Sequence, residues 1–331
     1  MESHRNYEEK QNTLNTLPIS RATISAPFLK FADDNNIDSS TVLKAFKLNK
    51  QALTNPNIYL PTHMIGRLAD TVAKLSNHHD LGFHAAQYND LDDLHPTLSK
   101  CIQSNNDLSG LLSTVMTHQK LQGSHFKLWV EYNENKLRIY HKSALKNTDR
   151  GFEYANDFTT FKLLGLLRKY LGNTWKPDYL VMENNSPPQA KIVGQTKQYR
   201  VITGQKCNYI PVECAIETLH FQSETQSRSC LSSRLEHIID IFWQHESFSL
   251  EFVAHLFGVS ERTLQRLFID QGSSFRDYIN KKKLKKSLEL LKEGMSVNDV
   301  AFELGYSDPS NFTRALKKQI NMTPRQYLMQ S

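Results

Sequence analysis

Apolar residues recur every three or four positions through much of the first half of the chain. This spacing places them on one face of a helix and predicts helices over residues 20–35, 39–46, 62–76 and 107–121. Within 62–76 the predicted buried face consists of Ile65, Leu68, Ala69, Val72 and Leu75. Asp38 or Ser39 can cap the second helix, because either side chain can accept a hydrogen bond from a free backbone N–H group.

The period then changes to two, which is typical of strands. Apolar side chains at 126, 128 and 130 alternate with Lys127, Trp129 and Glu131, residues 133–135 supply a turn, and a second strand follows over 137–140. A further helix is predicted over 157–171, and strands over 179–182, 191–193 and 207–212. The pattern predicts a mixed α+β domain of about 200 residues and names no activity.

The last hundred residues read as a series of short helices separated by regular turn signals. Helices are predicted over 231–245, 250–257, 261–270, 274–292, 297–304 and 309–319. Ser249, Ser260, Ser296 and Asp308 precede four of them as N-caps. Gly258 and Gly305 lie where a tight turn requires a positive φ.

A helix, a glycine turn and a capped second helix together are typical of a helix-turn-helix unit, and this arrangement occurs twice. Gly258-Val259-Ser260 of the first copy aligns with Gly305-Tyr306-Ser307 of the second. The side chains predicted to face inward are Leu264, Leu267 and Phe268 in the first copy and Phe312, Ala315 and Leu316 in the second. Two such units in tandem strongly favour a DNA-binding domain.

The helix predicted over 274–292 lies between the two units. Its apolar side is formed by Phe275, Ile279, Leu284, Leu288 and Leu291. Nineteen helical residues span about 28 Å at 1.5 Å each, which compares with about 34–36 Å between successive major-groove faces of B-DNA. A stiff helix of this length is expected to set two recognition helices into adjacent major grooves on one side of the duplex.

Length and charge agree with this division. A chain of 331 residues is long enough for about two domains, and the polar stretch 222–230 reads as the linker between them. Half of the net charge of +6 lies in the last third of the chain, where there are 15 basic and 12 acidic residues from Arg228 onward. Five lysines lie between Lys281 and Lys286. Such a block indicates either contact with a polyanion or a solvated helix face, and charge alone does not separate the two.

Other classes of protein are disfavoured by what the sequence lacks. No run of 18 apolar residues occurs, so no membrane span is predicted, and the polar N-terminus lacks a secretory signal core. Four cysteines without a C-x-x-C pair fit a reducing cytoplasm. His78, His79 and His84 match no standard metal-ligand spacing, and Cys207 and Cys214 are interpreted as small buried residues rather than a redox pair. No metal, cofactor or catalytic motif is therefore predicted.

The C-terminal sequence resembles the DNA-binding domain of AraC/XylS-type transcription regulators over residues 231–328. The resemblance is carried by Ala301, Leu304-Gly305-Tyr306, Asn311-Phe312-Thr313-Arg314, Lys317 and Thr323-Pro324. Asn321 replaces a common glycine, which is tolerable because asparagine also adopts the left-handed conformation. Lys283 stands where arginine is typical, a change that could alter a structural salt bridge.

The N-terminal sequence is similar to the arabinose-binding-type domain of some of these regulators. The similarity rests on Leu60-Pro-Thr-His-Met-Ile-Gly-Arg-Leu68 and on Asn77-His-His-Asp-Leu-Gly-Phe83. It implies a regulatory domain over 19–221 that senses a small molecule or mediates dimerisation. The domain type does not by its name imply a sugar ligand.

The resemblance also implies which side chains meet DNA. Those implied to contact bases are Arg262, Gln265, Arg266, Ser310, Asn311 and Arg314. Arginine can pair with guanine O6 and N7, and glutamine or asparagine with adenine N6 and N7. Thr263, Thr313 and Lys317 are implied to contact phosphates, which position the protein without specifying sequence.

The sequence thus predicts an α+β N-terminal regulatory domain followed by an all-α C-terminal domain with two helix-turn-helix units. The expected organisation is a flexible segment 1–18, a regulatory domain 19–221, a linker 222–230 and a DNA-binding domain 231–331. We expect a cytoplasmic transcription regulator, an activator and not an enzyme. Its implied partners are double-stranded promoter DNA, RNA polymerase, a second copy of the chain and a small-molecule effector of unknown identity.

Two alternatives remain open at the level of sequence. One is a regulator that acts through protein partners without any small-molecule ligand. The other is a DNA-repair alkyltransferase fused to this DNA-binding module, which needs an activated cysteine in a Pro-Cys-His-Arg setting. Cys207 is followed by Asn208 and Tyr209, and Cys101 by Ile102 and Gln103, so neither cysteine has that setting.

Overall fold

A computed structural model describes residues 17–88, 91–133, 136–185, 199–213, 239, 242–243, 248–270 and 272–329. The chain divides into two compact units, with the division between Ile238 and Ile239. The expected linker over 222–230, the strand expected over 191–193 and most of the helix expected over 231–245 lie outside the described residues. The domain boundaries therefore stay predictions.

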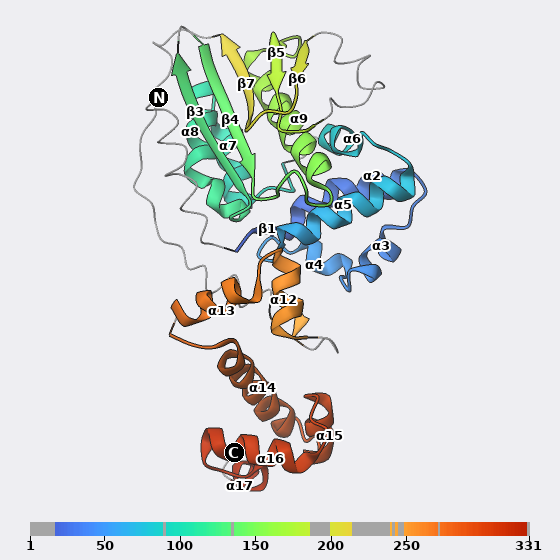
Figure 1. The fold of residues 1–331 in the computed structure, drawn as a ribbon, viewed down its shortest axis with the longest axis vertical. Helices are drawn as coiled ribbons and strands as arrows, with labels where there is room; N and C mark the ends of the chain where they lie inside the picture. The colour runs from blue at the N-terminus through green and yellow to red at the C-terminus, as the bar shows by residue number, and fades with distance from the viewer. Residues whose placement is uncertain are drawn as a thin grey trace. The chain divides into compact units, whose positions relative to one another are not determined.

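In the first compact unit, most of the helices precede the strands of the main sheet in the chain (Figure 1). Its helices are η1 (Ala22–Ser25), α2 (Ala26–Asp34), α3 (Ser39–Ala45), α4 (Lys50–Thr54), α5 (Thr62–Ser76), α6 (Leu81–Gln87), α7 (Pro96–Ser104), α8 (Leu108–His118), η2 (Gln119–Gln122) and α9 (Phe152–Leu171). Its strands are β1 (Ile19–Arg21), β2 (Tyr59–Pro61), β3 (Phe126–Asn133), β4 (Lys136–Ser143), β5 (Tyr179–Val181), β6 (Arg200–Ile202) and β7 (Asn208–Glu213).

Two of the predicted helices are confirmed in detail. Helix α5 has the predicted bounds, and α3 begins after Asp38, whose side chain accepts a hydrogen bond from the backbone N–H of Ser40 at 2.9 Å. The predicted apolar face of α5 is buried except at one position. Leu75 is 59% exposed, so its assignment to the core was wrong. It lies in the last turn of the helix.

The helix expected over 20–35 starts too early in the prediction. Ser20 and Arg21 belong to β1, which pairs antiparallel with β2, and the α-helix begins only at Ala26. The buried guanidinium of Arg21 donates hydrogen bonds to the Tyr59 hydroxyl at 3.0 Å and to the Leu121 carbonyl at 2.9 Å. Pairing with a segment some forty residues away overrides the local helical pattern here.

The main sheet has the strand order β3-β4-β7-β5-β6. The predicted hairpin of β3 and β4 is confirmed, with Val130 opposite Ile139. Helices α8 and α9 pack against the sheet, and β5 and β6 pair in parallel. Strand β6 was not predicted from the sequence. In Figure 1, α7 and α8 lie behind β3 and β4.

Helix α9 begins at Phe152, earlier than the predicted start at 157. Gly151 precedes it with φ 79°, and a Cβ atom there would lie 1.8 Å from the carbonyl oxygen of Gly66 on α5. Only glycine allows this approach of α5 to the start of α9. The approach depends on tertiary packing, so the helical periodicity did not reveal where α9 begins.

The second unit is helical in its described residues. It contains α12 (Leu250–Phe257), α13 (Glu261–Asp270), α14 (Phe275–Lys292), α15 (Val297–Glu303), α16 (Pro309–Ile320) and α17 (Pro324–Leu328). The predicted fold class is thereby confirmed. Within the described ranges, no helix has the combination of length and apolar character that a membrane crossing requires.

Candidate nucleic-acid interface

The two helix-turn-helix units begin with the same local device. Ser249 caps α12 by accepting a hydrogen bond from the Phe252 N–H at 3.0 Å, and Ser296 caps α15 by accepting one from the Asp299 N–H at 3.2 Å. Each cap satisfies a backbone donor that has no partner inside its helix. Both caps were predicted and are confirmed.

The turn between the helices is also built twice in the same way. Gly258 and Gly305 have φ 63° and 74°. In the first unit the N–H of Val259 donates to the Ala254 carbonyl at 3.0 Å, and in the second the N–H of Tyr306 donates to the Ala301 carbonyl at 2.9 Å. These bonds occupy carbonyls that the end of a helix leaves without a partner. The predicted glycine turns are confirmed.

The helices that follow the turns are capped as predicted. Ser260 accepts a hydrogen bond from the Thr263 N–H at 3.2 Å at the start of α13. Asp308 accepts one from the Ser310 N–H at 2.6 Å at the start of α16, where Pro309 occupies the first turn. The hydrogen bonds from Ser310 lower the pKa of Asp308.

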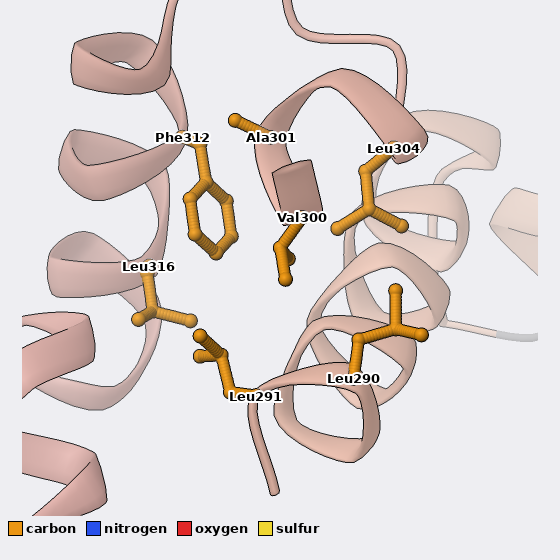
Figure 2. Packing of buried hydrophobic residues seen from close by; sticks show 7 residues of the cluster. All are labelled: Leu290, Leu291, Val300, Ala301, Leu304, Phe312 and Leu316. Atoms are coloured by element: carbon orange, nitrogen blue, oxygen red, sulfur yellow. The ribbon is translucent and has the colours of Figure 1, made fainter. Parts of the chain in front are cut away.

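An apolar cluster holds the second helix-turn-helix unit together (Figure 2). Phe312 and Leu316 point from α16 toward side chains of α14 and α15. The cluster consists of Leu290, Leu291, Val300, Ala301, Leu304, Phe312 and Leu316. Truncating a buried phenylalanine such as Phe312, which is 2% exposed, costs about 3–5 kcal/mol in comparable cores. Ala315, predicted to face inward, is only half-buried.

The first helix-turn-helix unit has its own apolar contacts. Leu264 and Phe268 of α13 are buried, as predicted, whereas Leu267 is half-buried. Phe268 contacts Phe275 and Tyr278 of α14, with ring centroids 5.5 and 5.8 Å apart. Because these rings belong to α13 and α14, they join the recognition helix to the connecting helix.

Helix α14 therefore contacts both helix-turn-helix units. Its first turn packs on α13 through Phe275, and its last turns place Leu290 and Leu291 in the cluster of the second unit. Leu290 was missing from the predicted apolar side. The 18 residues of α14 span about 27 Å, close to the predicted length.

The polar face of α13 carries the residues predicted for DNA. Arg262, Gln265 and Arg266 are exposed and lie at i, i+3 and i+4, so they are neighbours on one face. Thr263 is half-buried, and its hydroxyl lies 2.9 Å from that of Ser260. Its proposed phosphate contact must therefore compete with the helix cap.

The polar face of α16 brings together the second set. Ser310, Asn311, Arg314 and Lys317 are exposed, and Thr313 is half-buried. Arg314 Nη2 donates a hydrogen bond to Asn311 Oδ1 at 2.7 Å. This contact places the arginine next to the asparagine. Both side chains keep further donors for a base edge.

The lysine block does not behave as a single patch. Lys281 and Lys285 are exposed, whereas Lys282 and Lys286 are half-buried. Lys283 is turned toward the second helix-turn-helix unit and donates a hydrogen bond to the Leu304 carbonyl at 2.8 Å. The residues expected to form one charged face thus divide between solvent and protein.

Two features were missed in the sequence. Lys318 is exposed beside Lys317 in the last turn of α16 and adds a second cation to that end of the recognition face. Its position one residue after Lys317 was the available signal. The inward contact of Lys283 had no local signal, because the partner carbonyl lies 21 residues further along the chain.

The other candidate sites show ordinary structural contacts. His84 lies 3.3 Å from Asp80, and His78 Nδ1 lies 2.7 Å from the Ser76 carbonyl. No group of three or more potential metal ligands occurs in the described part of the chain. Burial raises the pKa of the Cys207 thiol to about 11, which disfavours the reactive thiolate. Cys214 lies outside the described residues.

Two family profiles match the chain, one for each unit. The profile described as "Arabinose-binding domain of AraC transcription regulator, N-term" matches residues 37–215, and the profile "Helix-turn-helix domain" matches residues 253–330. The first alone covers more than half of the chain. The second includes every residue predicted above to contact DNA.

Individual proteins are similar over shorter stretches. The probable transcription factor PqrA of Proteus vulgaris is 34% identical over 86 residues, which cover 25% of this chain and 70% of PqrA. The HTH-type transcriptional activator RhaS of Escherichia coli O6:H1 is 29% identical over 163 residues, 46% of this chain and 55% of RhaS. This chain thus spans about half the length of RhaS. Both relatives carry names of transcription regulators.

Among solved structures, the transcriptional regulator CdpR from Pseudomonas aeruginosa aligns with 87% of this chain and 97% of its own. The sequence identity is 17% and the TM-score is 0.37, too low to establish a common arrangement of the whole chain.

Proposed function

This chain belongs to the AraC family of transcription regulators, and on that premise we propose that it binds double-stranded promoter DNA sequence-specifically through α13 and α16. The observation that carries the proposal is the repetition of one capped, glycine-turned unit, each copy presenting an exposed polar face on its second helix. The side chains proposed to contact bases are Arg262, Gln265, Arg266, Ser310, Asn311 and Arg314. Those proposed to contact phosphates are Thr263, Thr313 and Lys317.

Each recognition helix enters a major groove in this proposal, with base edges read by its exposed face. Helix α14 is the connector, and its length of about 27 Å suits two grooves on the same side of the duplex. Arg314 and Asn311 act as a pair, because their hydrogen bond orients both toward the same stretch of DNA. Phosphate contacts fix the register of the helices on the duplex.

The regulatory half completes the proposal. Residues 19–221 sense a small molecule or mediate dimerisation, residues 222–230 link the halves, and residues 231–331 bind DNA. A ligand acts by binding the transcription-competent arrangement better than the other. Activation through RNA polymerase, homodimerisation, a cytoplasmic location and the absence of an enzymatic reaction rest on family membership alone.

Selection of binding sites from random DNA by the full chain tests whether α13 and α16 both recognise bases. We expect two sequence blocks whose centres are about one helical turn, or 10–10.5 base pairs, apart. The triple variant R262A/Q265A/R266A should erase one block, and S310A/N311A/R314A the other. The control variant K100A/Q103A, which changes exposed residues of α7, should leave both blocks intact.

A single block for the full chain, or preservation of both blocks in either triple variant, contradicts the proposal. Circular dichroism of each variant shows whether a lost block reflects lost contacts or an unfolded helix.

A further inference from the structure

Strand β3 is an edge strand of the main sheet. Among the described residues it has β4 on one side and no further strand on the other (Figure 1). With eight residues it is long enough to pair with a strand of another molecule. The backbone N–H and C=O groups along such an edge are a template for unwanted pairing, so proteins usually protect them.

The side chain of Gln119 covers the middle of this edge. Its amide oxygen accepts a hydrogen bond from the Leu128 N–H at 2.7 Å, and its amide nitrogen donates one to the Leu128 carbonyl at 3.4 Å. The same nitrogen donates to the Met116 carbonyl at 2.9 Å, which ties the amide to the end of α8. One side-chain amide thus takes the place that a neighbouring strand would have at Leu128.

The direction of the Leu128 N–H group shows which other backbone groups of β3 point outward. In an antiparallel pair, residues that exchange hydrogen bonds with the partner strand alternate with residues that do not. Since Leu128 donates to Gln119 and not to β4, the backbone groups of Phe126, Val130 and Tyr132 also point away from β4. These four residues form the edge that a second strand would meet.

The sequence of β3 is complementary to itself when two copies run antiparallel. With Trp129 opposite its own equivalent, Lys127 of each copy lies opposite Glu131 of the other, and Leu128 lies opposite Val130. Opposite charges that face each other across two strands stabilise the pairing, and like charges oppose it. A register centred on Lys127 or on Glu131 would place like charges opposite each other. The pattern therefore favours the register centred on Trp129.

This register requires the groups that Gln119 occupies. Leu128 and Val130 both point outward, so each Leu128 would exchange two hydrogen bonds with Val130 of the other copy. The pairing forms only if the Gln119 amide leaves Leu128 in both copies. Because Gln119 already satisfies the Leu128 backbone, little hydrogen-bonding free energy is gained by the exchange.

We propose that Gln119 guards the β3 edge and keeps a second copy of this chain from extending the sheet by antiparallel β3–β3 pairing. The guard acts through its two hydrogen bonds to Leu128. A homodimer formed for DNA binding would then use another surface. The guard itself does not depend on the proposed function.

Sedimentation velocity of the full chain over a range of concentrations tests the proposal. Gln119→Leu keeps a similar volume but removes both hydrogen-bonding groups. We expect this variant to form a species of twice the wild-type mass, with a dissociation constant at least about tenfold lower than that of the wild type for the same step. Gln103→Leu makes the same chemical change at an exposed position of α7 and should sediment as the wild type does.

Charge variants made in the Gln119→Leu protein show whether β3 mediates the association. Glu131→Lys should abolish the doubling of mass, because it places a positive charge opposite Lys127. Adding Lys127→Glu restores opposite charges across the pair, so the triple variant should associate again. Aggregation of a misfolded protein would not follow the charges in this way.

Hydrogen exchange of the wild-type chain adds a measurement that needs no variant. The Leu128 amide should be protected, since it donates to Gln119. Fast exchange at Leu128 overturns the proposal. So does a Gln119→Leu protein that sediments as the wild type at every concentration, or one whose association Glu131→Lys leaves unchanged.

Discussion

The ammonium group of Lys283 donates a hydrogen bond to the carbonyl oxygen of Leu304 at 2.8 Å. That carbonyl lies at the C-terminal end of α15, immediately before the turn at Gly305, where a cation is favoured by the helix dipole. The same ammonium lies 5.0 Å from the centroid of the Tyr306 ring. Burial lowers the pKa of Lys283. Lys283 thus attaches helix α14 to the turn of the second helix-turn-helix unit, although the lysine block around it has the sequence of a charged surface.

Replacing this lysine should destabilise the second helix-turn-helix unit against unfolding. Lys283→Met keeps the length of the side chain but removes the donor and the contact with Tyr306, and we expect a loss of about 1–2 kcal/mol in the free energy of unfolding. Urea denaturation measures this loss. Lys285→Met is the matched control, since Lys285 is exposed and should change stability by less than about 0.5 kcal/mol.

Equal stability of the two lysine variants would show that the contact with Leu304 contributes nothing. Lys283→Arg retains a donor and a cation at the turn, so it should recover most of the stability lost in Lys283→Met.

Arg266 and Arg314 should determine base preference, one in each recognition helix. Replacing either by alanine is expected to cost about 1–3 kcal/mol on the preferred sequence and to relax specificity at the positions it reads. Binding assays on the preferred site and on single-base variants of it measure both effects. Lys317→Ala provides the contrast, because loss of a phosphate contact weakens all sequences about equally. Unchanged footprints and affinities for both arginine variants would refute their assignment.

Lys281 and Lys285 decide whether the lysine block touches DNA. If both contact phosphate, replacing both by alanine should reduce the slope of log affinity against log salt by about 2, since each neutralised phosphate contributes about 0.9. Titrations of one DNA fragment at several salt concentrations give this slope. An unaltered slope in the double variant would identify the exposed lysines as a solvated helix face.

The stability of the first compact unit, which contains α9, should depend on pH through Asp157. Burial raises the pKa of this carboxyl to about 8, from an ordinary value of 3.8, while Asn184 donates a hydrogen bond to it at 2.7 Å. A pKa raised in the folded state means that stability falls as pH rises from about 4 to about 8. The asparagine of Asp157→Asn does not titrate. The free energy of unfolding of this variant should therefore rise relative to that of the wild type by about 1 kcal/mol per pH unit between pH 6 and 8.

Urea denaturation of wild type and Asp157→Asn at pH 6, 7 and 8 follows this difference. The advantage should level off above pH 8, where the wild-type carboxylate is ionised in both states. Parallel pH profiles for the two proteins would mean that the carboxyl does not titrate as inferred.

The sequence alone determined the features that depend on neighbours within about four residues. The caps at Ser249, Ser296 and Asp308 and the turns at Gly258 and Gly305 were all predictable, because a cap or a turn needs only a local acceptor or a permissive backbone. The β3–β4 hairpin followed from its alternation. The polar faces of α13 and α16 followed from helical spacing, although their contacts with bases remain predictions.

Only the tertiary structure decided the features whose partners lie far along the chain. Ser20 and Arg21 became a strand because Tyr59 and Leu60 pair with them, and Lys283 turned inward because folding brings the Leu304 carbonyl to it. Local patterns specify the helices and their ends, whereas the competition of distant groups for the same hydrogen bonds is settled only when the chain packs.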